Sequence, residues 1–408
     1  MRGSARNAGS KSTKDEVEEF SLDIPTHLRS IQARLNCGSY RFSVPRPVLA
    51  PREGKEPRPL LVRPVSDRVV ERAILQTLQT RTKVQQLIEG ASSFGAIPER
   101  GVRMGVEAVV EAIREGATHY VRSDIGGFFQ HIPRRQVMER IETLLPDDSV
   151  VPLLNQATEV NNKVFSEEAV GRYRDLYPTP EEGVAQGGGL SAFFGNVAME
   201  RFDAMMSEDG VTTVRYVDDF ITLARSQAVA MERFRQGEEY LATMDMKLYP
   251  PDGSMPEKAA QGETRTLFEF LGCEISASFV RPSRQARERI VGKVRERFDE
   301  ALADLRTGAV ARGSRRKSSI VRTLADVHNV VRSWSGSYSF CNADQILRTV
   351  DRQIDREIAR FLGEAGRIRR QTADENETMG RRVLGVFPTV DGRKNPLYGG
   401  APKAPEDT

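Results

Sequence analysis

The chain has 408 residues, of which 39% are hydrophobic and 29% are charged, and its formal net charge is +3. This length predicts two or three domains, and the composition is typical of a soluble globular protein with a substantial core. The sequence has no apolar run long enough to span a bilayer and no secretory signal at its polar start, so we expect no contact with membranes. Three widely spaced cysteines and four scattered histidines predict neither a disulfide framework nor a zinc site, which favours the cytoplasm.

Basic residues are concentrated in the last third of the chain. Residues 281–370 contain 21 Lys and Arg against 11 Asp and Glu, whereas the rest of the chain is slightly acidic. A basic third beside an acidic body indicates a polyanionic partner such as nucleic acid. The alternative is a solvated, arginine-rich helical face.

The first half of the chain mixes helical and strand patterns. Residues 1–20 are polar and read as a flexible tail, and 21–80 combine short helices with a proline-rich extended stretch. Apolar residues recur at helical spacing over 66–88, where Ser66 or Asp67 is placed to cap the helix, and again over 101–116. Residues 119–125 predict a strand that ends at an aspartate, followed by a helix from Pro133.

The second half repeats this mixture and then becomes helical. An apolar helix is expected over 190–206, two strand runs over 212–225, an amphipathic helix after them, and a strand pair over 268–276. From 281 to 370 the pattern is helical and basic, and 371–408 reads as an extension and tail. The fold class predicted is α+β, with an antiparallel sheet and helices over 21–280 and a helical domain after it.

Two adjacent carboxylates interrupt the strand pattern "VRYVDDFITL" at 214–223. Aspartate is depleted in strands, and two together repel. If the stretch folds as a hairpin with Asp218 and Asp219 at its turn, an adjacent strand ending at Asp124 brings three carboxylates together. Divalent magnesium prefers carboxylate oxygens, and two such ions ~3.5–4 Å apart serve phosphoryl transfer. Taken singly, the same residues are consistent with an ordinary turn and a helix cap.

The joint pattern resembles a reverse transcriptase. "YVDD" (216–219) has the form of that family's Y-x-D-D box, and "SDIGGFFQHI" (123–132) resembles its first metal motif. "QGGGLSAFFGN" (186–196), "PEKAAQGETRTLFEFLGCEIS" (256–276), "KEPRPLLVRPVSDRVVERAI" (55–74) and "SSFGAIPERGVR" (92–103) resemble further family segments, in the family's order. Three positions depart from the usual residues, namely Ala192 for Pro, Phe194 for Leu and Glu71 for Gln.

Residues 330–358 are similar to the thumb of group II intron reverse transcriptases. The resemblance therefore implies a right-hand polymerase with fingers and palm followed by an α-helical thumb. By its size, and by the lack of retron motifs and of DNA-binding and endonuclease domains, the chain resembles the bacterial, stand-alone, group II-like enzymes, many of which serve in antiviral defence.

The resemblance also implies catalytic roles. Asp124 and Asp218 would bridge two Mg²⁺ ions, with Mn²⁺ as a possible substitute; Asp219 would lie beside them, and the carbonyl of Ile125 would add a metal ligand. Lys258 matches the lysine that protonates the leaving pyrophosphate, although an irregular spacing makes Lys247 a competitor.

Further roles concern the substrates. Phe129 stands at the sugar gate that excludes a 2′-hydroxyl and so selects dNTPs, while Phe128 reads as a core residue. The dNTP would also be bound by Lys55, Arg58 and Gln186. The residues expected to contact template or duplex are Arg100, Arg103, Gly187, Gly188, Arg284, Arg287, Arg315, Arg316 and Lys317. Trp334 and Tyr338 read as thumb core.

The implied function is RNA-directed DNA synthesis, with an RNA template, a cognate non-coding RNA as its expected source, dNTPs as substrates and cDNA as product. Homo-oligomers are compatible with the basic surfaces. Three alternatives stay open: a template-independent or protein-primed DNA polymerase on the same fold, an enzyme of an intron- or retron-type element, and a nucleic-acid-binding scaffold without activity.

Overall fold

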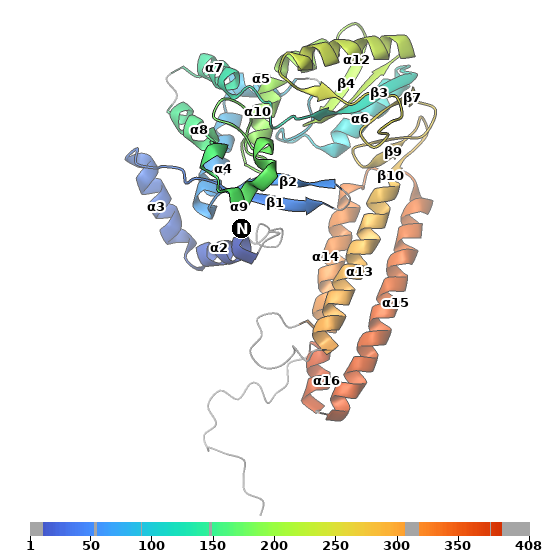
Figure 1. Ribbon diagram of the computed structural model, residues 1–408. Coiled ribbons are helices and arrows are strands. Elements are labelled where there is room, and N and C mark those ends of the chain that lie inside the picture. The colour runs from blue at the N-terminus through green and yellow to red at the C-terminus, as the bar shows by residue number, and fades with distance from the viewer. Residues whose placement is uncertain are drawn as a thin grey trace, which may run out of the picture. The chain divides into compact units, whose positions relative to one another are not determined.

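A computed structural model describes residues 11–52, 55–90, 92–146, 149–306, 318–375 and 377–385. The chain divides into two compact units, Met1–Leu271 and Gly272–Thr408, which Figure 1 shows in one view. The division lies N-terminal to the boundary predicted after residue 280. The first unit is built on an antiparallel sheet with helices and the second is mainly helical, which confirms the predicted α+β class.

The sheet of the first unit is centred on β3 (His119–Gly126). Strand β5 (Asp219–Ala224) pairs antiparallel with β3 on one side and with β4 (Thr212–Tyr216) on the other. Strands β6 (Lys247–Leu248) and β7 (Ala259–Glu263) also pair antiparallel with β3. This arrangement confirms the strand predicted at 119–125 and the hairpin predicted at 212–225.

Helices pack on both faces of this sheet (Figure 1). On one face the ring of Phe220 in β5 stacks on Phe234 of α12 (Gln227–Ala242), 6.4 Å between centroids. On the other face α6 (Val102–Arg114) comes so close that a Cβ on its Gly105 would lie 3.5 Å from Val214 of β4. Alternation of side chains along the strands therefore buries both faces.

The other elements of the first unit surround this layer. Two predicted long helices are each broken: 66–88 forms α4 (Val65–Gln79) and α5 (Thr82–Ile88), and 190–206 forms α10 (Ser191–Ala198) and α11 (Glu200–Met206). Further elements are β1 (Arg46–Arg52) paired with β2 (Lys55–Val62), α7 (Arg134–Leu144), α8 (Val150–Thr158), α9 (Glu167–Val170), β8 (Phe268–Phe270) and the short 3-10 turns η1 (Asn162–Val164) and η2 (Gly171–Leu176).

The capping predicted for α4 is wrong. Its N-cap is Pro64, with no side-chain cap. Asp67 instead accepts hydrogen bonds from the Tyr40 hydroxyl (2.7 Å) and the Ser43 backbone N–H (2.8 Å). The carboxylate is thus used to anchor the preceding segment to the helix.

The flexible tail predicted through residue 20 is wrong from Lys11 onward. Residues Lys11–Leu22 form α2, which is followed by α3 (Ile24–Asn36). Val17 and Phe20, three positions apart, are both buried, and Phe20 stacks on His27 at 4.6 Å. Two apolar residues on one helical face were enough to dock a segment whose composition is otherwise polar.

The described residues of the second unit form a hairpin and four helices. Strands β9 (Cys273–Ile275) and β10 (Val280–Pro282) pair antiparallel. The helices are α13 (Arg284–Arg306), α14 (Ile320–Ser337), α15 (Asp344–Glu375) and α16 (Glu377–Leu384). Their core includes Phe298 stacked on Phe361 at 4.5 Å, and Trp334 packs against it.

Two features of the second unit bear on the predictions. Helix α15 continues past residue 370, so the boundary predicted there falls inside a helix. Residues 386–408 of the predicted tail lie outside the described residues.

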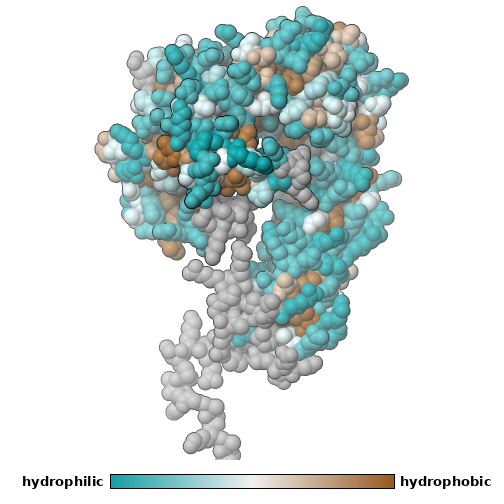
Figure 2. Space-filling view, in the orientation of Figure 1, coloured by the Kyte–Doolittle hydropathy of each residue, from teal (hydrophilic) through white to brown (hydrophobic). Residues whose placement is uncertain are grey.

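The visible surface is predominantly hydrophilic, with small scattered apolar patches (Figure 2). Within the described ranges, no helix combines the length and the apolar character needed to cross a membrane.

Candidate active site

Three aspartates meet where β3 and the β4–β5 hairpin run side by side. Asp124 lies directly opposite Asp219 in the β3–β5 register, and Tyr216 pairs with Asp219 to close the hairpin. Asp218 is in the two-residue turn, where its carbonyl accepts the N–H of Ile125 at 2.7 Å. The hairpin placement predicted from the sequence is confirmed.

The turn itself is conformationally unusual. Val217 has φ 63°, and a β-branched residue in the left-handed region is a true outlier. Such strain persists only where the surrounding structure holds it in place. Gly95 packs directly against the turn, since a Cβ added to it would lie 2.6 Å from the Val217 backbone nitrogen.

The turn carboxylates are in an unfavourable environment for negative charge. Burial, followed by the charge of Asp124, raises the pKa of Asp219 to about 7. Burial likewise raises the pKa of Asp218, with Asp124 contributing. The Oδ1 atom of Asp219 is buried and has no hydrogen-bond partner. Buried carboxylates that repel one another and keep a free oxygen fit a cation, which is the usual partner of such a group.

Lys258 supplies the nearest positive charge. Its ammonium forms an ion pair with Asp124, and its carbonyl accepts the Asp124 backbone N–H at 3.0 Å. Burial opposes protonation, but the bond to Asp124 outweighs it and the pKa of Lys258 is raised. The competitor Lys247 is exposed on β6, so the contact with the aspartates belongs to Lys258.

No cluster of three or more His, Cys, Asp or Glu within the described ranges has the arrangement of a metal site. The donor set is nevertheless entirely carboxylate oxygen beside backbone carbonyls, which suits a hard divalent cation.

The residues predicted to bind the nucleotide differ in their exposure and in their contacts. Arg58 on β2 is exposed, and its positive charge acts to lower the pKa of Asp218. The Arg58 guanidinium therefore lies close enough to interact electrostatically with the turn. The side chain of Lys55 lies outside the described residues. Phe129 is partly buried with its ring edge-on to Phe128 at 5.1 Å, and Phe128 is buried as predicted.

The glycine-rich segment is anchored by its backbone. The Gln186 carbonyl accepts the Leu61 N–H at 3.1 Å, and Gly187 is exposed with φ 93°. The Gly189 N–H donates to Glu71 at 3.2 Å, and Arg63 contacts the same carboxylate at 3.1 Å. Glu71, seen in the sequence only as a departure from glutamine, therefore fixes this loop to α4.

The residues predicted to contact nucleic acid differ in how far their side chains are available to a ligand. The Arg100 guanidinium donates to the carbonyls of Glu89, Gly90 and Ser93, so most of its donors hold a loop. Arg103 is exposed and paired with Glu107.

In the second unit, Arg284 is exposed and paired with Glu288, and Arg287 is bound to Glu274 at 3.2 Å. In the first unit, the predicted contact residue Gly188 donates its N–H to the Ala185 carbonyl. Arg315, Arg316 and Lys317 lie outside the described residues.

Arg215 of β4, which the sequence analysis did not single out, is fully buried within the β4–β5 hairpin. The one available signal was an arginine inside an otherwise apolar strand run, since a charged residue is rarely buried unless it is paired.

The strands, the paired aspartates and the ordered motifs define the class of this protein. The family model "Reverse transcriptase (RNA-dependent DNA polymerase)" matches residues 50–275, more than half of the chain, and the chain belongs to this family.

Among individual proteins, the chain is 22% identical over 250 residues to Protein YkfC of Escherichia coli strain K12, covering 52% of this chain and 62% of YkfC. It thus spans about three fifths of that relative.

Solved structures with some likeness include an apo telomerase from Candida tropicalis, with 13% identity and a TM-score of 0.44 over 85% of this chain and 64% of that one. A partial Cas6-RT-Cas1–Cas2 complex has 20% identity and a TM-score of 0.31 over 56% of this chain and 40% of that one.

Proposed function

We propose that this protein is an RNA-directed DNA polymerase that makes cDNA from dNTPs by two-metal phosphoryl transfer. The observation that carries the proposal is the direct pairing of Asp124 with Asp219 beside the Asp218 turn. Raised pKa values at Asp218 and Asp219 support it, because they mark carboxylates whose charge is uncompensated by the protein alone.

In this proposal Asp124, Asp218 and the Ile125 carbonyl hold two Mg²⁺ ions, and Asp219 shapes the field beside them. When bound, the ions lower the pKa of the primer 3′-hydroxyl and stabilise charge on the transferred phosphate. Lys258 gives a proton to the leaving pyrophosphate in this scheme, and its ion pair with Asp124 supports that role.

The substrate is held by the surrounding elements. Lys55 and Arg58 on β2 bind the triphosphate, Gln186 and the adjacent glycines approach the nucleotide and template, and the Phe129 ring excludes a 2′-hydroxyl. Exposed arginines of α13, including Arg284, contact the duplex backbone in the same scheme.

We propose further that the template is a cognate non-coding RNA and that the setting is antiphage defence in the bacterial cytoplasm. The support is the resemblance to stand-alone, group II-like enzymes. A loss of phage protection on Asp218→Asn would support this setting, while unchanged protection by that variant would refute a role for synthesis in it.

The first test is incorporation of labelled nucleotides by the purified protein with its co-purifying nucleic acid. Reactions contain Mg²⁺ and either dNTPs or rNTPs, with and without RNase pretreatment. Asp218→Asn should abolish incorporation, and Asp245→Asn, which changes an exposed aspartate of the same unit, is the matched control.

The outcomes separate the alternatives. RNase-sensitive dNTP incorporation that Asp218→Asn abolishes supports the proposal. RNase-insensitive incorporation points to untemplated or DNA-templated synthesis, and full activity of Asp218→Asn contradicts the assigned site. If no incorporation occurs even with added RNA template and annealed primer, a binding role replaces the enzymatic one.

A further inference from the structure

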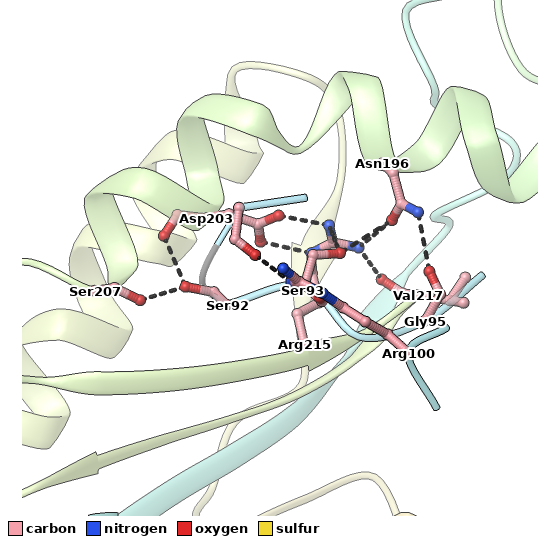
Figure 3. A network of polar contacts seen from close by, with 10 residues as sticks. Ser92, Ser93, Gly95, Arg100, Asn196, Asp203, Ser207, Arg215 and Val217 are labelled. Atoms are coloured by element: carbon pink, nitrogen blue, oxygen red, sulfur yellow. Dashed lines mark hydrogen bonds and ion pairs between the residues drawn. The ribbon is translucent and has the colours of Figure 1, made fainter. Parts of the chain in front are cut away.

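Arg215 lies in β4, two residues before Val217, and its side chain is fully buried. All five N–H donors of the guanidinium are used (Figure 3). The Nε and one Nη2 donor bind the two carboxylate oxygens of Asp203, each at 2.6 Å. This side-on, two-point geometry is the strongest kind of arginine–carboxylate contact.

The remaining donors reach three other segments. One Nη1 donor binds the Asn196 side-chain oxygen at 3.2 Å and the other binds the Val217 carbonyl at 2.9 Å. The second Nη2 donor binds the Ser93 hydroxyl at 3.0 Å. One side chain therefore joins α10, α11, the 92–95 segment and the catalytic turn.

The 92–95 segment is also held directly against β4. The Arg215 N–H donates to the Ser92 carbonyl at 2.7 Å, and the Phe94 N–H donates to the Arg215 carbonyl at 2.9 Å. Asn196 donates to the Gly95 carbonyl at 2.9 Å. These bonds press Gly95 against the Val217 nitrogen, where a Cβ would not fit.

A buried guanidinium is costly to desolvate, and replacing it by an apolar side chain often costs little stability. Its position at this turn is therefore better explained by the geometry that it imposes. Val217 adopts a left-handed conformation that its side chain disfavours, and the structure around it must supply the restraint. The guanidinium does so through the Val217 carbonyl.

We propose that Arg215 is a positioning residue that fixes the Val217–Asp218 turn, with Asp203, Asn196 and Ser93 holding its guanidinium in place. The catalytic consequence rests on the function proposed above, because it assumes that Asp218 holds Mg²⁺ at the reacting phosphate. The positioning itself does not depend on that function.

The chain offers a matched control. Arg233 on α12 is also a buried arginine, with 6% of its side chain exposed, and it binds Asp209 at 2.7 Å and the Met205 carbonyl at 2.6 Å. It makes no contact with the turn among the contacts of the described residues. A lysine at either position keeps the charge but loses the fork that binds several acceptors at once.

The first readout is hydrogen exchange of peptides covering 214–223 and 119–126, which needs no activity. Arg215→Lys should raise exchange in both peptides, because the Ile125 N–H donates to the Asp218 carbonyl. Arg233→Lys should leave both unchanged. Ser93→Ala, which removes one of the five acceptors, should give a smaller increase and serves if Arg215→Lys does not fold.

The second readout is steady-state dNTP incorporation. Arg215→Lys should lower kcat on the order of 10²-fold, the loss typical of a misplacement of about 1 Å, and raise the Mg²⁺ concentration for half-maximal activity. The KM for dNTP should stay within about twofold, because Arg215 lies outside the proposed nucleotide contacts.

The results distinguish the two proposals. If the wild-type protein incorporates no nucleotide, the proposed function fails, and hydrogen exchange still tests the positioning. If folded Arg215→Lys shows unchanged exchange at the turn, or loses activity only to the extent of Arg233→Lys, the positioning role is overturned.

Discussion

Neutralising Asp219 should stabilise the metal-free protein, and it should do so only above a definite pH. Asp219 is opposite Asp124, and one of its oxygens is buried without a partner. Its pKa is raised from 3.8 to about 7, first by burial and then by Asp124. The Asp219→Asn variant keeps the shape of the side chain but carries no charge to bury.

The magnitude follows from this pKa. Each pKa unit corresponds to about 1.36 kcal/mol, so ionising Asp219 in the folded protein costs up to ~4 kcal/mol. Part of the side chain reaches solvent, which screens the charge and reduces the cost to ~2–4 kcal/mol. Since the folded state binds the extra proton between pH ~4 and ~7, wild-type stability falls as pH rises through that window.

The free energy of unfolding of Asp219→Asn should therefore exceed that of wild type by ~2–4 kcal/mol at pH 8 and by little near pH 4. Urea titrations in EDTA, read by hydrogen exchange of β3 and β5 peptides, confine the measurement to the first unit. Asp245→Asn is the matched control. Adding Mg²⁺ at pH 8 should stabilise wild type and close the gap.

A stability gain that is the same at pH 4 and pH 8 would refute the reasoning, because it would not arise from ionisation. A loss of stability at pH 8 would mean that the Asp219 charge is compensated within the protein. A gain at pH 8 that Mg²⁺ does not diminish would leave the electrostatics intact but contradict the metal site.

Three further substitutions test other parts of the site. Phe129→Ala should relax discrimination against rNTPs, measured as the ratio of kcat/KM for dNTP and rNTP; an unchanged ratio would place the gate elsewhere. Gly95→Ala should destabilise the protein by ~1–3 kcal/mol in urea unfolding and reduce incorporation, because its Cβ would lie 2.6 Å from the Val217 nitrogen; Gly90→Ala, with nothing within 4 Å, is the control. Burial raises the pKa of Glu71, so Glu71→Gln should cost less than ~1 kcal/mol at pH 7. Glu71→Ala removes the carboxylate that contacts the Arg63 Nε and accepts the Gly189 N–H, so it should cost ~2–5 kcal/mol. Equal losses would show that the charge itself is essential.

The carboxylate pair was predictable because it violates a local rule. Asp218 and Asp219 interrupt an apolar strand pattern, and such a conflict between propensity and position marks functional sites. The alternation of strand residues then dictated which neighbour they would face. The β3–β5 register places Asp124, near the end of β3, opposite Asp219, the first residue of β5.

Features that depend on tertiary contacts could not be predicted from the sequence. Helix α2 is held by Val17 and Phe20, whose burial depends on surfaces formed by distant elements. The irregular spacing in the chain left Lys247 as a competitor of Lys258. The pairing of β3 with both β6 and β7 places Lys258 against Asp124.

Arg215 shows that a family motif does not include all the residues that hold its turn in place. The Y-x-D-D pattern includes the turn but not the arginine before it, the Asp203 that neutralises it or the Gly95 that packs against the turn. These residues lie in three chain segments, and none of them carries a chemical signature of catalysis. Yet a β-branched residue at φ 63° cannot hold that conformation alone. The motif therefore specifies the proposed catalytic groups, while in our proposal the buried guanidinium and its partners fix the position of the turn that carries them.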